Sequence, residues 1–481
     1  MSLKQVMSAL AVSSVLSLPA LASDYLDTST SFSDENKHTK TRVIFVPEGT
    51  AVELPEWSGS DVNAVSRAAE IEEFKGEASQ LTTVIAPEGT KANHLLLAGV
   101  GNPAELSRFE AEKLGASIAA ALKPELESVV FDTRLISNPG IAAELSSHMA
   151  HGIDLRNYRF DRYQSEPKER PQTAYHWLMK SPDMAEKKYL ASRAIAEGVF
   201  VARDITALPG SDGYPEAIVK LAQEAMKDLN IELTIVTPEQ VKEMGMGLLH
   251  SVSQGSQHGS YLLAAHYKGS NADPIALVGK GNTFDTGGYN LKTSSSSILR
   301  MQTDKAGAGA VIGAVMALAA QEAPVNVVAV APLSHNLISG SATLPGDVVK
   351  AGDGTLVEIA NLTGSKVGAL GTGYAALFAS EDDLRSAIIE AGNVTGEKVW
   401  ELPLEGYDGI IDSPLADIRN IGSPGTQAGA AFLKHFAGDT PWIHIDMAAD
   451  AMVSSDTGIH PAGPTGFGVR LLTEWVHQLE Q

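Results

Sequence analysis

The sequence predicts an α/β fold in two parts: a small N-terminal α/β domain, and a larger C-terminal α/β domain with a mixed, mostly parallel sheet covered by helices. Three observations lead to this prediction. Short apolar runs alternate with helical stretches from about residue 41 to 180, and they do so again after residue 214. Between these regions, residues 183–206 carry one long helical pattern. The chain has 481 residues, 44% of them hydrophobic, which is enough for two cores.

The N-terminal domain is expected over residues 41–182. A helix is expected from Ala111 to Leu122, because Leu114 and Ile118 recur on one stripe with Leu122. Strands are expected at 42–46, 81–85, 94–98, 128–131 and 171–179.

The C-terminal region is expected over residues 183–481, beginning with the joining helix. The run at 261–265 is interpreted as a strand that forms a hairpin with the strand at 275–278, and Ser294 to Ser297 as a flexible loop. Further strands are expected at 231–236, 325–330 and 443–447, and further helices at 216–228, 306–320 and 467–476.

Charge and cysteine content narrow the function. The net charge of −22 gives a surface that repels phosphate backbones and anionic lipids, so we expect neither nucleic acid nor a membrane as a partner. The chain has no cysteine, so thiolate chemistry and disulfides are excluded. Any metal must be held by oxygen and nitrogen ligands.

The N-terminus predicts export. Residues 1–22 contain one cation, Lys4, then an apolar run from Val6 to Leu18 and the small residues Ala20-Leu21-Ala22. This is the pattern of a signal peptide, too short for a membrane anchor. We therefore expect a bacterial periplasmic or secreted protein whose residues 23–40, which are polar, are disordered.

The stretch from Ile275 to Asp304 is the candidate site. A buried strand is followed by a Gly-rich turn with Lys280 and Asp285, then by Lys292, and then by Asp304 at the start of an Ala/Gly-rich helix. Open α/β sheets place their ligand crevices after strand ends. Two lysines and two carboxylates in such a cleft must pair, bind metal or shift their pKa values. A phosphate-binding loop is excluded, because Gly281 follows Lys280 where that motif requires Ser or Thr.

Four runs carry a family resemblance that covers most of the chain after about residue 184. They are VGKGNTFDTGGYNLK, NLISGSATLPGDVVKAGDGT, NLTGSKVGALG and FLKHFAGDTPWIHIDMA. The chain resembles the leucine aminopeptidases, two-metal exopeptidases that remove N-terminal residues from peptides with a free N-terminus. The resemblance implies two Mn²⁺ or Zn²⁺ ions and a homohexamer.

The resemblance also implies roles for individual residues. Lys280, Asp285 and Asp304 would be metal ligands. Lys292 would be the catalytic cation that stabilises the tetrahedral intermediate. The substrate's first side chain would be lined by Asn361, Thr363, Gly364 and Ala449.

One family motif is absent from the sequence. The leucine aminopeptidases carry an N-T-D-A-E-G-R run that supplies two further metal ligands and an arginine, and here the chain passes directly from Thr355-Leu-Val-Glu-Ile-Ala to Asn361-Leu-Thr-Gly. With only two matched carboxylates and one amine, the site is expected to hold one metal ion or none. Asp347, Asp353 and Glu358 lie near the join and are considered as substitutes.

Two interpretations follow. The chain is an aminopeptidase homologue with impaired activity, or a non-catalytic binding or structural oligomer on the same fold. Three histidines are considered as ligands: His335 could bind metal or be a turn histidine, and His148 and His151 are interpreted as exposed.

Overall fold

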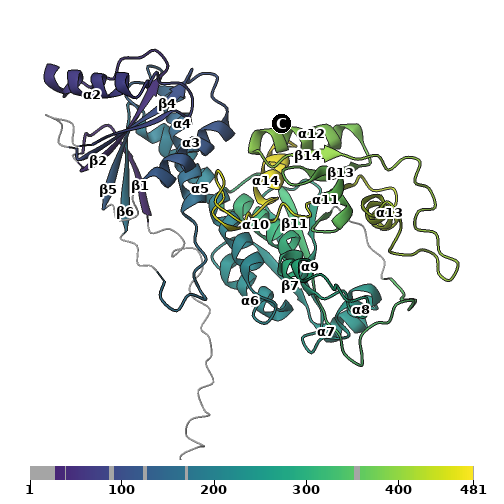
Figure 1. Cartoon of the computed structure of the whole chain (residues 1–481). Coiled ribbons are helices and arrows are strands. Elements are labelled where there is room, and N and C mark those ends of the chain that lie inside the picture. Colours follow the sequence, from purple (N-terminus) through teal and green to yellow (C-terminus); the bar gives the residue numbers. More distant parts are fainter. Residues whose placement is uncertain are drawn as a thin grey trace, which may run out of the picture.

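The computed structural model describes residues 28–37, 39–85, 92–122, 127–167, 172–351 and 358–479. It has two lobes joined by the long helix α5 (Pro182–Ala207), as Figure 1 shows. Pro182 lies at the helix start, where its missing N–H costs nothing. The two-part α/β architecture that the sequence predicts is confirmed.

The N-terminal lobe is built on a six-stranded sheet with one antiparallel edge strand, β3. Three helices accompany it: α2 (Gly59–Ile71), α3 (Arg108–Ala121) and α4 (Pro139–Asn157). The strands, in spatial order, are β1 (Thr28–Ser33), β6 (Thr173–Leu178), β5 (Ser128–Asp132), β2 (Thr41–Pro47), β4 (His94–Gly101) and β3 (Leu81–Ile85).

Two expectations for this lobe are wrong. Residues 23–40 are not all disordered, because Thr28–Ser33 pair in parallel with β6, and Phe32 stacks on Trp177. His148 and His151 are not exposed, since α4 is packed between α3 and α5 and His151 is fully buried. The expected signal peptide, residues 1–22, lies outside the described residues.

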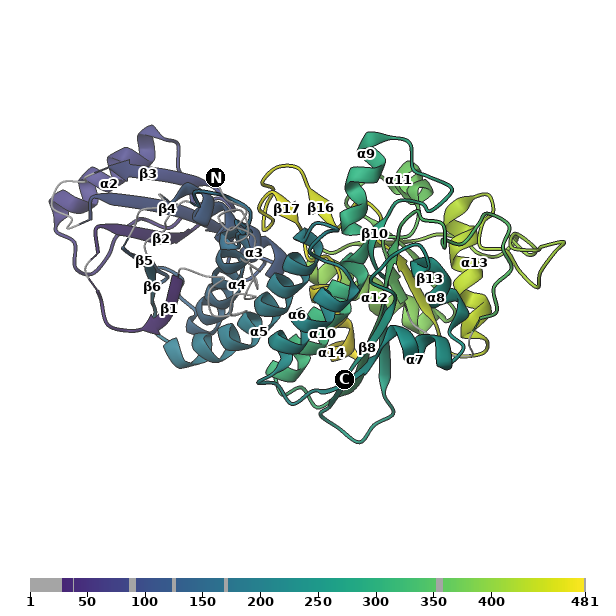
Figure 2. The ribbon, with the colours of Figure 1, turned by 90° about the horizontal axis from the view of Figure 1, so that it is seen from below.

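The C-terminal lobe is built on a nine-stranded mixed sheet. Eight strands follow one another across the sheet, and the ninth, β10 (Gly281–Asp285), pairs with β11 outside this order. A separate two-stranded piece, β16 (Met452–Val453) with β17 (Gly463–Pro464), lies nearer the first lobe (Figure 2). The main strands, in spatial order, are β14 (Val399–Glu401), β13 (Ala375–Ala379), β15 (Ile443–Asp446), β12 (Glu358–Ala360), β9 (Ile275–Gly279), β11 (Asn326–Asn336), β8 (Tyr261–Lys268) and β7 (Glu232–Val236).

The order of strands corrects the expected hairpin between 261–265 and 275–278. β11 lies between β8 and β9, antiparallel to the first and parallel to the second. The loop after Lys268 therefore spans the width of one strand instead of making a tight turn. The expected flexible loop at Ser294 to Ser297 is also wrong in part, because α9 (Ser295–Leu299) begins there.

Helices complete the lobe around the sheet. One face is covered by α10 (Ala306–Ala320), which follows the 3₁₀ helix η1 (Arg300–Lys305), and by α14 (Val469–Gln478). The others are α6 (Pro215–Met226), α7 (Pro238–Glu243), α8 (Gly247–Ser253), α11 (Gly364–Leu370), α12 (Asp382–Thr395) and α13 (Gly425–Ala437).

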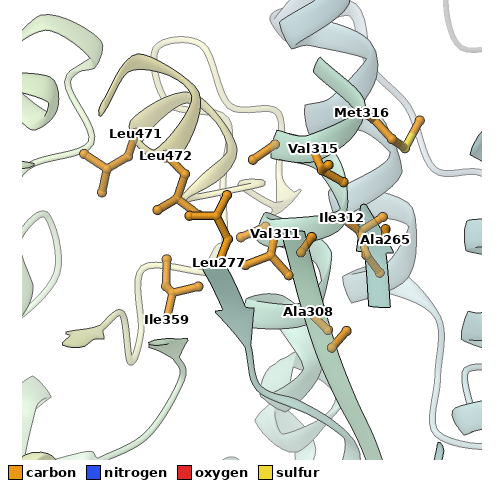
Figure 3. Packing of buried hydrophobic residues seen from close by; sticks show 14 of the residues in the cluster. Ala265, Leu277, Ala308, Val311, Ile312, Val315, Met316, Ile359, Leu471 and Leu472 are labelled. Carbon is orange, nitrogen blue, oxygen red and sulfur yellow. The ribbon is translucent and has the colours of Figure 1, made fainter. Parts of the chain in front are cut away.

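The core beneath the candidate site is tightly packed. Leu277 of β9, Val311 of α10 and Leu472 of α14 point toward one another in Figure 3. Where α10 crosses α5, a Cβ on Gly198 would lie 2.3 Å from the Gly313 carbonyl oxygen, so only glycine permits this approach. The rigid layer of β9, α10 and α5 fixes the position of the η1 segment that carries Asp304.

The helical run Ser295–Ala320 is the one stretch of the described residues that is long and apolar enough to cross a membrane. Of its most apolar window, 94% is buried inside the protein. It is the central packing element of this lobe.

Candidate functional site

Lys280 lies between β9 and β10, at the centre of the sheet. Its N–H donates to the Ile359 carbonyl (3.1 Å), and its carbonyl accepts from Ala308 at the start of α10 (2.9 Å). These two backbone bonds tie Lys280 to β12 and to α10. The side chain is thereby aimed at η1, where its ammonium donates to Asp304 Oδ1 (2.8 Å) and to the Asn361 carbonyl (3.1 Å).

The second pair lies at the end of β10. Asp285 accepts hydrogen bonds from the Gly287 N–H (3.0 Å) and from Asn336 Nδ2 (2.7 Å), and its other oxygen is paired with the Lys292 ammonium. Asp285 ends a strand that pairs with β11, which corrects the expected Gly-rich turn at this point. A strand end positions the carboxylate more firmly than a turn.

Electrostatics keep these groups charged. Burial works to lower the pKa of Lys280, but the Asp304 carboxylate at 2.8 Å and the charge of Asp285 raise that pKa above its ordinary value. Burial likewise works to raise the pKa of Asp285, but the Lys292 ammonium holds that pKa below its usual range. Burial raises the pKa of Asp304 to about 6, because the Lys280 ammonium offsets only part of the effect. At neutral pH the cleft therefore holds two ammonium groups opposite two carboxylates.

The predicted substrate-binding residues lie beside the cleft. Asn361 bonds Thr303 Oγ1 (3.0 Å), one residue before Asp304. Thr363 caps α11, and Gly364 is the first residue of that helix. Ala449, beyond the end of β15, has a left-handed backbone with φ of 70°.

Asp446 organises this group of residues. It is fully buried, and its carboxylate accepts the N–H groups of Leu362 (3.0 Å), Thr363 (3.0 Å) and Ala448 (3.1 Å). One side chain thus holds both segments expected to line the substrate pocket. Sequence reasoning missed Asp446, although it ends a buried strand as Asp285 does.

The described candidates for replacing the absent ligands are engaged in other contacts. His335 Nδ1 lies 3.0 Å from Ser256 Oγ, and its ring lies beside that of His258, so its contacts are with the segment after α8. Glu358 lies 3.0 Å from the buried His444 ring. Asp347 accepts from the Leu344 N–H at an exposed turn (2.8 Å), and Asp353 is outside the described residues.

The donor set of the cleft suits a metal ion only in part. Among the described residues, no group of three or more histidine, aspartate or glutamate side chains is placed to hold an ion. Asp304 Oδ2 is buried and has no hydrogen-bond partner within this part of the chain, which leaves one oxygen free for a cation. Lys280 donates to Asp304, and it could offer a lone pair to a metal ion only after its ammonium lost a proton. Asp285 and Asp304 are the described carboxylates of this cleft that could hold an ion.

Comparison with known proteins identifies the family to which the chain belongs. The model of the cytosol aminopeptidase family catalytic domain matches residues 200–362 and 355–473, and that of its N-terminal domain matches residues 53–167. The chain belongs to the cytosol aminopeptidase family. The resemblance to leucine aminopeptidases is thereby confirmed.

Named relatives of the family span nearly the whole chain. "Probable cytosol aminopeptidase 1" of Shewanella oneidensis is 37% identical, over 93% of this chain and 96% of the relative. "Probable cytosol aminopeptidase" of Rhodopseudomonas palustris (strain BisA53) is 36% identical, over 87% and 91%. A solved structure, "Bottromycin maturation enzyme BotP in complex with Mn", is 26% identical with a TM-score of 0.80, and the match covers 92% of this chain and 100% of that one.

The predicted export is wrong. The curated relatives are named cytosol aminopeptidases, which points to the cytosol and contradicts a periplasmic or secreted location. An apolar run flanked by one lysine and by small residues satisfies the composition of a signal peptide. Composition alone does not establish that such a run directs export.

Proposed function

We propose that this chain binds peptides by their free N-terminus and is an aminopeptidase homologue whose hydrolysis is impaired, because its cleft lacks the ligands for a metal pair. Membership of the family, and the Mn bound by the solved relative BotP, support metal dependence in general. In two-metal hydrolysis the ions polarise the scissile carbonyl and activate a water. The residues of this cleft can support only part of that chemistry.

One observation carries the proposal. Within the described residues β12 covers Glu358–Ala360, and the next residue, Asn361, already begins the turn that leads into α11. In the family that the chain resembles, the N-T-D-A-E-G-R run and its helix precede this strand. The contacts of Lys280 with Asp304 and with the Asn361 carbonyl are compatible with a cleft that lacks those ligands.

The comparisons support the same interpretation. The two matches to the catalytic-domain model overlap at residues 355–362, so this short stretch matches the model in two places. The alignment with the Shewanella oneidensis relative is 486 positions long, more than the chain itself, although it covers 93% of the chain. Such an alignment requires positions in the relative that this chain skips.

Charge balance explains the expected loss of activity. The substrate's N-terminal ammonium can pair with Asp285 or Asp304 only by displacing the lysine that neutralises that carboxylate. Lys292 can stabilise an anionic intermediate only if it leaves Asp285. A non-catalytic binding role is the second candidate, because Asn361, Thr363 and Ala449 lie together beside the cleft while the ligand run is absent from the sequence.

The assembly is part of the proposal. The resemblance implies a homohexamer, and exposed apolar side chains occur near the cleft and on the long loop before α13: Leu299, Val348, Leu415 and Ile421 are 67–79% exposed. Such side chains are suited to burial between subunits. Light scattering of the purified chain would test this, and a monomer would contradict it.

The test of the function is a graft. A variant would carry the N-T-D-A-E-G-R run and its following helix ahead of β12, and hydrolysis of a leucyl anilide in Mn²⁺ would be compared with that of the unaltered chain. We expect the graft to raise the rate at least 100-fold, and a graft with both of its acidic residues changed to amides to give no gain. Robust turnover by the unaltered chain, unchanged by the graft, would overturn the proposal.

A further inference from the structure

A second lysine–aspartate pair lies beneath the predicted substrate pocket. Lys366, in the first turns of α11, is fully buried. Its ammonium donates to the Gly371 carbonyl (3.1 Å), to the Ala448 carbonyl (2.9 Å) and to the Asp450 carboxylate. An ammonium has three N–H donors, so all three are used inside the protein.

Asp450 completes this network from the other side. Its Oδ1 accepts from the Gly373 N–H (2.8 Å), and its backbone carbonyl accepts from Thr465 Oγ1 (2.7 Å). The Lys366–Asp450 pair therefore joins three segments: α11, the turn at residues 371–373, and the turn that follows β15. These segments are far apart in the sequence, and Lys366 and Asp450 are separated by 84 positions.

The turn after β15 contains a strained residue. Ala449 has φ of 70°, a left-handed conformation that is unfavourable for a residue with a Cβ. It persists because both flanking residues are fixed. The Ala448 N–H donates to Asp446 (3.1 Å), the Ala448 carbonyl accepts from Lys366 (2.9 Å), and the Asp450 N–H donates to the Met447 carbonyl (2.9 Å).

The pair links the two sides of the predicted pocket. The backbone N–H of Lys366 donates to the Thr363 hydroxyl (3.4 Å), on the α11 side of the pocket. The Lys366 ammonium donates to the Ala448 carbonyl, on the side of the Ala449 turn. We propose that Lys366 and Asp450 are positioning residues that set the spacing between the first turn of α11 and the Ala449 turn, and so determine which N-terminal side chains fit. This inference rests on the proposed binding of peptide N-termini in this cleft.

Stability and selectivity can be separated in a test. Replacing both members of a buried ion pair by neutral groups of similar size is often neutral for stability, whereas removing one leaves a charge unpaired. The double variant Lys366→Met with Asp450→Asn removes the charges but keeps an acceptor for the Gly373 N–H. The exposed pair Lys220 and Glu216, joined at 2.7 Å on α6, supplies the matched control, Lys220→Met with Glu216→Gln.

The experiment measures binding, so that it does not depend on turnover. Alaninamide, leucinamide and phenylalaninamide would be titrated into the full chain by NMR, and the ratio of the strongest to the weakest affinity compared between variants. We expect this ratio to fall at least threefold in the double variant and to be unchanged in the control. If the double variant does not fold, Lys366→Gln with Asp450→Asn, which keeps a polar group at both positions, is measured instead, and we expect its ratio to fall about twofold.

The outcomes distinguish the two proposals. If the unaltered chain discriminates among the amides and the folded variant keeps the same ratio, the positioning role is overturned and the proposed function stands. If the unaltered chain binds none of the amides, the proposed function and the positioning role both fail. A loss of overall affinity with an unchanged ratio would show a structural role only and would also overturn the inference.

Discussion

The lysine–aspartate pairs of the cleft and the pair beneath it use the same chemistry in different surroundings. In the cleft, the side chains of Lys280 and Lys292 are 24% and 26% exposed. Lys366 is fully buried and Asp450 is 5% exposed. Water, a cation or a substrate can compete for the cleft groups, whereas nothing can replace the partners of Lys366. The first two pairs are therefore exchangeable, and the third is a fixed part of the fold.

The largest expected effect comes from breaking the buried pair. Lys366→Met leaves the Asp450 carboxylate without its cation, and we expect the free energy of unfolding to fall by about 3–5 kcal/mol. Urea unfolding measures this loss. Lys366→Met with Asp450→Asn should recover most of it. A double variant as unstable as the single one would show that the packing of Lys366, and not its charge, is what matters.

Lowering the pH tests the burial of His460, which lies at the junction of the two lobes. Burial, together with Arg203 and Arg470, lowers the pKa of His460 to about 3, while the unfolded chain titrates at its ordinary value of 6.5. Because the folded pKa is depressed, the neutral ring contributes stability above pH 6.5, and this is lost as the pH falls toward 3. Between pH 6.5 and 5.5 the loss from this residue is about 1 kcal/mol.

The corresponding measurement is urea unfolding at pH 7.5 and 5.5. His460→Gln should reduce the loss of stability on acidification by about 1 kcal/mol, because the variant has no ring to protonate in the unfolded state. The pKa of His148 is also lowered to about 3 by burial and neighbouring cations, so a smaller pH dependence should remain. An unchanged dependence in the variant would contradict the burial of His460.

A smaller effect is expected at the strained turn. Ala449→Gly removes the cost of a left-handed backbone at φ of 70°, and the greater freedom of glycine in the unfolded chain offsets part of that gain. We expect the free energy of unfolding to rise by about 0.5–1 kcal/mol in thermal or urea unfolding. A destabilised variant would mean that the Ala449 methyl group contributes more by packing than the strain costs.

The smallest effect is expected in the cleft. Lys292→Met removes a partly exposed ion pair, whose contribution is reduced by solvent, so unfolding should change by less than about 1 kcal/mol. This small change in unfolding free energy would contrast with the large loss expected for Lys366→Met. A loss of several kcal/mol at Lys292 would show that the cleft pairs are structural and not exchangeable.

Much of the fold follows from local patterns in the sequence. The strands near residues 42, 94 and 128 and the long joining helix lie where apolar periodicity places them. The hairpin between 261–265 and 275–278 is wrong because β11, which separates these strands, comes from about 50 residues later in the chain. Which strands are neighbours depends on distant pairing that periodicity does not record.

The residues of the candidate site also fall into two groups, those that one local stretch predicts and those that only the fold brings together. Lys280, Asp285, Lys292 and Asp304 lie in one stretch, and the structure brings them together as two ion pairs. Lys366 and Asp450 were not predicted, because each is an ordinary polar residue in its local sequence. Only the fold brings them within bonding distance. The buried histidines were missed for a related reason, since an isolated histidine gives no local indication of its burial.

We propose that this cleft cannot hold two metal ions, and a count of bound ions is the sharpest test of that proposal. The purified chain would be dialysed against excess Mn²⁺ or Zn²⁺ and weighed intact by native mass spectrometry, with metal content measured in parallel. We expect at most one ion per chain, lost on Asp304→Asn because that change removes a charged ligand. Two ions per chain, both retained through gel filtration, would overturn the proposal.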